Sequence, residues 1–293
     1  MASHEFVTVD VFTDRRFGGN PLAVFPRAEG LSGADMQALA AEFNLSETAF
    51  VLPPDDPAHT ARVRIFTPRG EVPFAGHPNV GTALVLAARM AEPPDRMVFE
   101  EAAGLVPITL EYGERATATV EAPLPLAVGA EVPVQTVAAC AGLRPDRVRT
   151  AAHRPVIVSV GLGFCVAEVD ADALAQAAPD PAMFRVAAGA HPTFGMEFSL
   201  HLYARDGERL RARMFAPLDG IPEDPATGSA NAALAALLLH LDPGRQSAAF
   251  DVGQGDEMGR PSRLRAAARR GPDGIRATVG GGAVPVLRGT AEL

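Results

Sequence analysis

The sequence predicts an α+β fold of two pseudo-repeated domains, and three observations support this prediction. The 293 residues exceed the usual size of a single core. Two short motifs occur twice in the same order: R-I-F-T-P (64–68) and H-P-N-V-G-T-A (77–83), then R-M-F-A-P (213–217) and D-P-A-T-G-S-A (224–230). Each second motif opens a stretch that is apolar almost all round, which is typical of a helix buried on every side. We expect each domain to wrap a curved, barrel-like antiparallel sheet around its apolar helix.

In the N-terminal half, periodicity predicts two helices and seven strands. Ser32 can cap a helix over 32–43, whose apolar positions share one face. The run 78–90 is the first helix with no polar face. Alternating or short apolar segments predict strands. These segments are 6–12, 22–25, 47–52, 62–66, 97–100, 105–110 and 116–121.

The charge-free run A-P-L-P-L (122–126) predicts the connection between the domains. We therefore expect an N-terminal domain over 1–125 and a C-terminal domain over 126–293, with the last strand free to cross back to the first domain. The C-terminal half repeats the plan, with its all-apolar helix over 225–241 and two further helices over 134–141 and 171–178. Its expected strands are 156–160, 165–169, 199–204, 210–215, 264–268, 274–279 and 283–287.

Composition excludes several classes of function. A net charge of -9 argues against nucleic acid as a partner, because binding phosphates needs a basic face. All 26 basic residues are arginine, which excludes a Schiff-base lysine and pyridoxal phosphate held by one. The two cysteines, Cys140 and Cys165, form no C-x-x-C and fit a reducing compartment. No signal peptide or membrane-spanning stretch is evident, so we expect a cytoplasmic protein with no membrane partner.

The two apolar helices suggest an anion-binding site. A helix N-terminus presents free backbone N–H groups and a partial positive charge, which favour a carboxylate. We expect both helices to begin at Gly-Thr/Ser-Ala, where the hydroxyls of Thr82 and Ser229 add donors. Two such N-termini that face each other across a cleft would bind a small anionic substrate. The alternative is that the motif is only a tight helix entrance.

Three titratable residues are candidates for acid/base chemistry. His77 and Asp224 occupy the same place in the two copies of the motif, although a histidine here is often structural and an aspartate often a helix cap. Glu47 enters an apolar strand in N-L-S-E-T-A-F. Burial would raise its pKa, so that it both takes and gives a proton near neutrality. Alternatively, it is a charge at a strand edge.

Rival motifs are incomplete. V-G-L-G-F-C-V has Val166 where a dinucleotide site needs its third glycine, and no phosphate-binding G-x-x-x-x-G-K-[ST] exists. The seven histidines show no H-x-x-x-H and no cysteine at ligand spacing, so no metal is expected. Ser229 does not lie in G-x-S-x-G, which argues against an esterase. Gly280-Gly281-Gly282 is expected to form a turn between strands.

Six longer motifs follow one another along nearly the whole chain. They are D-V-F-T-D-R-R-F-G-G-N-P-L-A-V (10–24), N-L-S-E-T-A-F-V (44–51), T-P-R-G-E-V-P-F-A-G-H-P (67–78), E-D-P-A-T-G-S-A-N (223–231), Q-G-D-E-M-G-R-P-S (254–262) and V-G-G-G-A-V (279–284). With these motifs the chain resembles the PhzF family of phenazine-biosynthesis-like isomerases, which share the fold of diaminopimelate epimerase. One departure is Asn79, where the family commonly has threonine.

The resemblance implies two pseudo-symmetric diaminopimelate epimerase-like domains and a cofactor-independent homodimeric enzyme. It assigns the proton shuttle to Glu47, with His77 and Asp224 as its catalytic partners. The related epimerases use two cysteines at the helix entrances, and these positions carry none here. Two-cysteine racemisation is therefore excluded, and a one-base proton shift remains.

We therefore expect an isomerase that shifts a proton in a small unsaturated or cyclic amino acid or carboxylate, at a cleft between domains. The setting would be secondary metabolism, such as antibiotic biosynthesis. The alternatives are a lyase or hydro-lyase that uses the same base, or a ligand-binding homologue without turnover. The residues expected to bind substrate are Gly76, Gly228, Ser229, Asn20 and Thr82.

Overall fold

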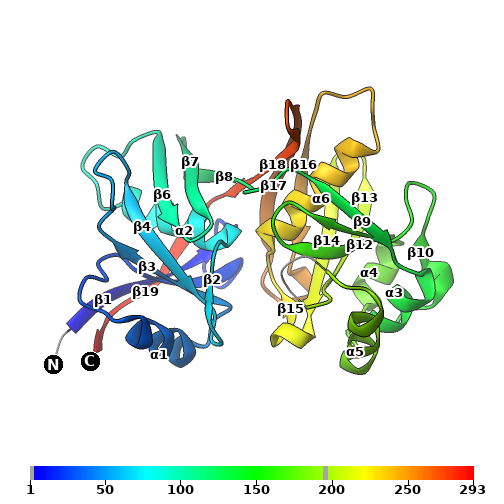
Figure 1. Cartoon of the computed structure of the whole chain (residues 1–293), viewed down its shortest axis with the longest axis horizontal. Coiled ribbons are helices and arrows are strands. Elements are labelled where there is room, and N and C mark those ends of the chain that lie inside the picture. Colours follow the sequence, from blue (N-terminus) through cyan, green and yellow to red (C-terminus); the bar gives the residue numbers. More distant parts are fainter. Residues whose placement is uncertain (1–2, 194–196) are drawn as a thin grey trace. The chain divides into compact units, whose positions relative to one another are not determined.

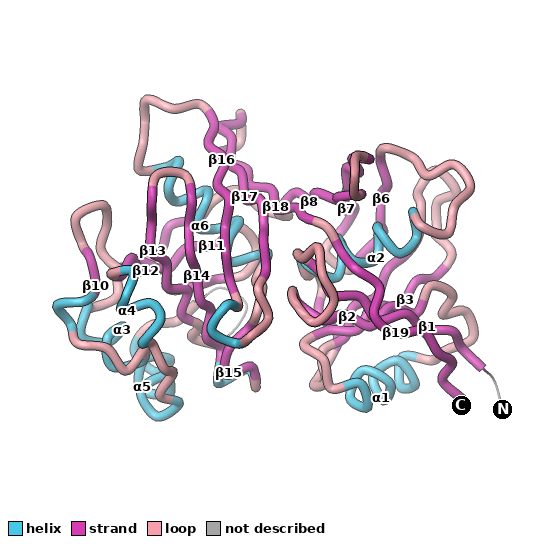
Figure 2. Tube along the Cα trace, turned by 180° about the vertical axis from the view of Figure 1, so that it is seen from behind, coloured by secondary structure: helices cyan, strands magenta, loops and turns pink. Residues whose placement is uncertain are grey.

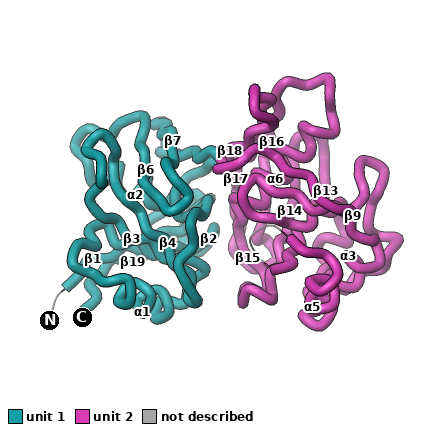
Figure 3. The backbone as a smooth tube through the Cα atoms, viewed as in Figure 1, with its two compact units in different colours: residues 1–121, 280–293 teal, residues 122–279 magenta. Residues whose placement is uncertain are grey.

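The computed structural model describes residues 3–193 and 197–293. The chain divides into two compact units, one of residues 1–121 and 280–293 and the other of residues 122–279 (Figure 3). The chain therefore passes from unit 1 to unit 2 and returns at its end. Each unit has its own buried helix (Figure 1).

From residue 3 onward, unit 1 contains two helices and nine strands. Helix α1 spans Gly33–Phe43 and α2 spans Gly76–Ala87. Ser32 caps α1 in a capping box with Asp35, as a serine before the helix predicts. The strands are β1 (Ser3–Val11), β2 (Asn20–Phe25), β3 (Glu47–Leu52), β4 (Ala61–Phe66), β5 (Glu71–Val72), β6 (Arg96–Glu101), β7 (Gly104–Tyr112), β8 (Ala116–Glu121) and β19 (Ala283–Glu292).

The described residues of unit 2 form four α-helices and ten strands. Helix α6 (Gly228–His240) is its buried helix, and the others are α3 (Val134–Cys140), α4 (Ala171–Gln176) and α5 (Pro181–Ala190). The strands are β9 (Ala127–Glu131), β10 (Val148–Arg149), β11 (Val156–Ser159), β12 (Gly163–Val169), β13 (Leu200–Asp206), β14 (Arg209–Ala216), β15 (Ile221–Asp224), β16 (Ser247–Gln254), β17 (Ser262–Gly271) and β18 (Gly274–Gly281).

The two units repeat one strand order. In unit 1, β1 and β2 are antiparallel, β2 and β3 parallel, β3 and β4 antiparallel, and β4 and β6 parallel. In unit 2 the same relations join β11 to β12, β12 to β13, β13 to β14, and β14 to β16. The α+β class is confirmed, but each sheet is mixed rather than antiparallel. The parallel pairs arise because a helix crosses over between their strands, α1 and α2 in unit 1.

The strand that follows the last strand of each sequence repeat pairs with the first strand of the other repeat. Strand β9 follows β8 of unit 1 but pairs with β11 of unit 2. Strand β19 follows β18 but pairs antiparallel with β1 over its whole length, from Ser3 opposite Glu292 to Val11 opposite Ala283. The two chain ends therefore lie side by side (Figure 2).

Helices α2 and α6 form the centres of the two cores. Helix α2 contacts β1, β2, β3, β7, β8 and β19, and α6 contacts β11, β12, β16 and β17. Eleven of the thirteen residues of α6 are buried, as expected of a helix with no polar face. Within the described ranges, no helix combines the length and apolarity that crossing a membrane requires.

Candidate active site

Helix α2 begins at Gly76, two residues earlier than its apolar pattern predicts. Its N-cap residue, Ala75, is extended and offers no side chain to the free N–H groups of the first turn. His77 therefore lies inside that turn, with its side chain 5% exposed. The N-terminus of α2 and the His77 imidazole therefore belong to the same helical turn.

The prediction that α2 begins at the Gly-Thr-Ala sequence is wrong. Gly81 and Thr82 lie in the second turn and are buried. A Cβ atom at Gly81 would come within 2.6 Å of Leu22 and 2.8 Å of Val11, so this glycine allows α2 to approach β1 and β2 closely. The structure thus gives Gly81 a packing role and places the Thr82 hydroxyl in the core, away from the open N–H groups.

Glu47 is the first residue of β3 and faces His77. Its Oε2 atom lies 3.7 Å from His77 Nε2, and its side chain is 18% exposed. Burial raises the pKa of Glu47 to about 7, and a hydrogen bond from Ser46 opposes this shift. A carboxyl group with this pKa is present in both its acid and its base form near neutral pH, as a proton shuttle requires.

Asn20 is connected to this group through Ser46. It is the first residue of β2, which runs parallel to β3 with Leu22 opposite Glu47. The Ser46 hydroxyl donates to Asn20 Oδ1 at 3.3 Å. Unit 1 therefore brings Glu47, His77, Asn20 and the open N-terminus at Gly76 into one locality.

In unit 2, α6 begins at Gly228, as the sequence motif predicts, after the N-cap residue Thr227. Again no side chain caps the helix, and Ser229 in its first turn is half-buried. Asp224 ends β15 and is 5% exposed. Its Oδ2 atom accepts a hydrogen bond of 2.5 Å from the Thr227 hydroxyl.

A buried polar network holds the segment between Asp224 and α6. Gln254, at the end of β16, donates from Nε2 to the Asp224 carbonyl (2.8 Å) and the Thr227 hydroxyl (3.1 Å). Its Oε1 accepts from the Thr227 N–H (3.2 Å) and from Asn231 Nδ2 (2.8 Å). Asn231 also donates to the Thr227 carbonyl, and its Oδ1 faces His201 Nε2 at 3.2 Å.

The structural repeat differs in register from the sequence repeat. Counted from their first helical residues, Gly76 and Gly228, the position of His77 in α2 is that of Ser229 in α6. His77 and Asp224 are therefore not equivalent in the fold, because α2 begins one residue before the histidine and α6 begins four residues after the aspartate. The roles proposed for His77 and Asp224 must therefore be argued from the contacts that each residue makes in its own unit.

The cysteines are unsuited to proton transfer. Cys140 and Cys165 are both free and buried in unit 2. Burial raises the pKa of Cys140 to about 12 and that of Cys165 still further, so both stay protonated at neutral pH. Across residues 3–193 and 197–293, no cluster of three or more His, Cys, Asp or Glu side chains is placed to hold a metal ion.

The family model for phenazine biosynthesis-like proteins matches residues 9–289. The chain belongs to this family. Curated relatives include an uncharacterized isomerase of Mesorhizobium japonicum, 38% identical over 99% of both chains. Another is the trans-2,3-dihydro-3-hydroxyanthranilate isomerase of Pseudomonas aeruginosa, 37% identical over 99% of this chain and 100% of that protein.

Solved structures give the same fold. A phenazine biosynthesis protein of the PhzF family from Bacillus anthracis superposes with a TM-score of 0.89, at 23% identity and full coverage of both chains. A hydroxyproline epimerase from Agrobacterium vitis superposes with a TM-score of 0.62, at 14% identity, over 99% of this chain and 93% of that one. The diaminopimelate epimerase-like fold and the assignment as a PhzF-family isomerase are therefore confirmed.

Proposed function

We propose that this PhzF-family protein is a cofactor-independent isomerase that moves a proton between two carbons of a small unsaturated or cyclic amino acid. One observation carries the proposal: Glu47 is a largely buried carboxyl group, with a pKa raised to about 7, that faces His77. Trans-2,3-dihydro-3-hydroxyanthranilate, named for the Pseudomonas aeruginosa relative, is the first substrate to test.

Glu47 would act as the single base and the single acid of the reaction. Its carboxylate takes a proton from one carbon, and the electron pair of the broken C–H bond moves the double bond along the substrate. The resulting carboxylic acid then returns the proton to a second carbon. Atoms and charge balance without an added reactant, so the mass of the product equals that of the substrate. His77 and Asp224 would assist as acid/base partners or substrate ligands.

The substrate carboxylate would bind at the helix N-termini. The N-cap residues of α2 and α6, Ala75 and Thr227, make no side-chain cap hydrogen bond, and a helix N-terminus favours an anion. Gly76 and Gly228 contribute backbone N–H groups, and the half-buried Ser229 contributes its hydroxyl. Asn20, beside Glu47, would be a further ligand. Thr82 is not included, because its side chain is buried in the core.

The setting remains that predicted from the sequence. We propose a cytoplasmic homodimer that acts in secondary metabolism, such as antibiotic biosynthesis. Light scattering of the purified protein tests the homodimer directly, since a mass of twice 30.6 kDa is expected.

The reaction is tested by incubation with trans-2,3-dihydro-3-hydroxyanthranilate and unsaturated cyclic amino acids in deuterated water, followed by mass spectrometry. We expect an isomer that carries deuterium at carbon, because the acid proton of Glu47 exchanges with solvent. A product of changed skeleton mass would instead indicate a lyase or hydro-lyase. Binding without exchange or product would indicate a ligand-binding protein and contradict the proposal.

The pH dependence of the reaction follows from the pKa of Glu47. A base must be ionised to accept a proton, so kcat/KM is expected to rise with pH through about 7 in the free enzyme. The Ser46 hydroxyl lowers the pKa of Glu47. Its removal is therefore expected to shift the rise of kcat/KM to higher pH. Initial rates from pH 5 to 9 for wild type and Ser46→Ala measure the shift. A rise of kcat/KM centred at the ordinary pKa of glutamate would contradict the assignment of Glu47 as the base.

A further inference from the structure

A second carboxyl group in unit 1, Glu101, is buried without an evident counter-charge. Within the described residues, both of its carboxylate oxygens are buried and neither has a hydrogen-bond partner of normal geometry. Burial raises the pKa of Glu101 to about 8, and the nearby Asn79 amide opposes this shift only in part. The proposed reaction does not use this group, so another reason is needed for an acid in this place.

Unit 2 has a glutamine in the corresponding place. Glu101 ends β6 and Gln254 ends β16. Each of these strands follows the buried helix of its unit; β6 runs parallel to β4, and β16 runs parallel to β14. Asn79 and Asn231 are both the fourth residue of their helices, and each donates its amide to the N-cap carbonyl, at 3.0 and 2.9 Å. Gln254 accepts from Asn231, just as Glu101 faces Asn79.

The hydrogen bonds of Gln254 indicate that a side chain at this position must both donate and accept. The amide accepts through Oε1 and donates through Nε2 to the backbone and hydroxyl of the segment before α6. A carboxylate only accepts, whereas a carboxylic acid accepts through one oxygen and donates through the other, like an amide. In unit 1 the end of β6 also lies against the segment before α2, where the Ala103 N–H donates to the Pro73 carbonyl at 3.1 Å.

We propose that Glu101 is a neutral carboxylic acid that takes the place of a glutamine and braces the segment 72–75, which leads into the helix turn that carries His77. Glu101 is then a positioning residue. Its effect on catalysis rests on the proposed function, whereas its protonation state and its bracing role do not. The two parts of the inference therefore have separate tests.

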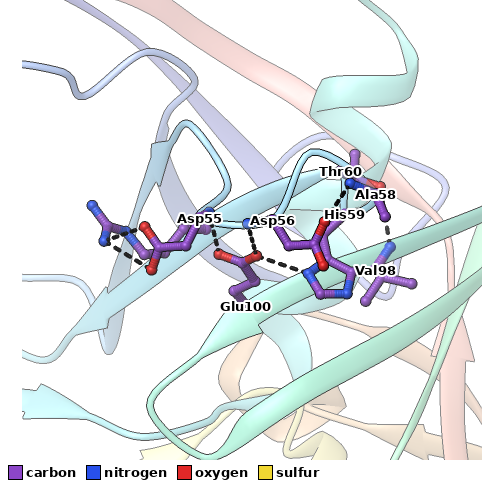
Figure 4. Close-up of polar contacts among 8 residues, drawn as sticks. Asp55, Asp56, Ala58, His59, Thr60, Val98 and Glu100 are labelled. Carbon is purple, nitrogen blue, oxygen red and sulfur yellow. Dashed lines mark hydrogen bonds and ion pairs between the residues drawn. The ribbon is translucent and has the colours of Figure 1, made fainter.

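The protonation state is tested by infrared difference spectroscopy at pH 6, with the neighbouring glutamate as the control. Glu100 accepts hydrogen bonds from the Asp55 and Asp56 N–H groups, at 2.6 and 2.9 Å, and contacts His59 at 2.7 Å (Figure 4). These contacts lower the pKa of Glu100 to about 2. We expect Glu101→Gln to remove the C=O band of a protonated acid and Glu100→Gln to remove carboxylate bands. Loss of carboxylate bands in Glu101→Gln would overturn the proposal.

The bracing role is tested by comparing two variants of similar size. Glu101→Gln keeps a donor and an acceptor, whereas Glu101→Met keeps neither. We expect the glutamine variant to match the wild type in Tm and in amide hydrogen exchange over 71–80. The methionine variant should lose several degrees of Tm and exchange faster in that segment. Equal behaviour of the two variants would overturn the bracing role.

Activity then separates this inference from the proposed function. With a substrate that the wild type turns over, Glu101→Gln should keep kcat within about twofold, and Glu101→Met should lower kcat more than it changes KM. If the wild type turns over no substrate, the proposed function fails while the infrared and exchange results still decide the role of Glu101. A glutamine variant that folds normally but has lost activity would overturn the positioning role.

Discussion

Replacing Glu47 with glutamine is expected to lower kcat for the proton shift by about 10²- to 10⁴-fold, the range that a positioned acid/base residue contributes. Glutamine keeps the shape of the side chain but neither accepts nor releases a proton at neutral pH. The fold should persist, because about half of the native carboxyl groups are already uncharged at pH 7. Deuterium incorporation into the substrate should fall by the same factor as turnover.

The matched control is Glu42→Gln, which makes the same chemical change on an exposed position of α1. Its kcat should equal that of the wild type. Circular dichroism and Tm of both variants show whether the fold is kept. A folded Glu47→Gln protein that still incorporates deuterium at the wild-type rate would contradict the assignment of Glu47 as the base.

Replacing Arg213 with leucine is expected to destabilise the protein by about 3–5 kcal/mol, the cost of removing one partner of a buried ion pair. Arg213 is 6% exposed and forms a bidentate pair with Glu223, with N–O distances of 2.7 and 2.8 Å. It also donates to the carbonyls of Leu174 and Ala177. The leucine variant leaves the Glu223 carboxylate and both carbonyls without these donors.

The pseudo-repeat supplies the control for this prediction. Arg64 pairs with Glu71 in the same bidentate manner, at 2.7 Å for both contacts, but these side chains are 31% and 37% exposed. Arg64→Leu is expected to cost about 0–1 kcal/mol, because water replaces the lost partner. Urea unfolding at pH 7 measures both values. Equal losses for the two variants would contradict the assignment of the larger effect to burial.

Much of the fold was predictable because its elements have clear periodicity. The strands Glu47–Leu52 and Ala116–Glu121 have the predicted bounds. Both buried helices were predictable from their lack of a polar face, and Glu47 was predictable because an acid entering an apolar strand is unusual. The helix Pro181–Ala190 was missed, although Asp180 caps it and Pro181 opens it.

The remaining errors concern contacts between segments that are far apart in the sequence. Whether α2 begins at Gly76 or near Gly81 depends on how closely it approaches β1 and β2, which local pattern does not reveal. The equivalence of His77 and Asp224 was inferred from matching letters and failed for the same reason. The role of Gln254 depends on the end of β16 lying beside the segment before α6, which the sequence does not reveal. The motif Q-G-D-E-M-G, which begins at Gln254, was the available signal for this residue.

The exchange of β9 and β19 has a consequence for how the protein is made. A ribosome has synthesised all of residues 1–121 long before β19 exists, so β1 lacks its outer neighbour until the segment Ala283–Glu292 emerges. Nascent unit 1 therefore exposes an open sheet edge throughout synthesis of unit 2, which is the kind of edge that pairs with other chains. Strand β19 converts that vulnerable intermediate into the finished unit, so unit 1 is completed only after all of unit 2 has been synthesised.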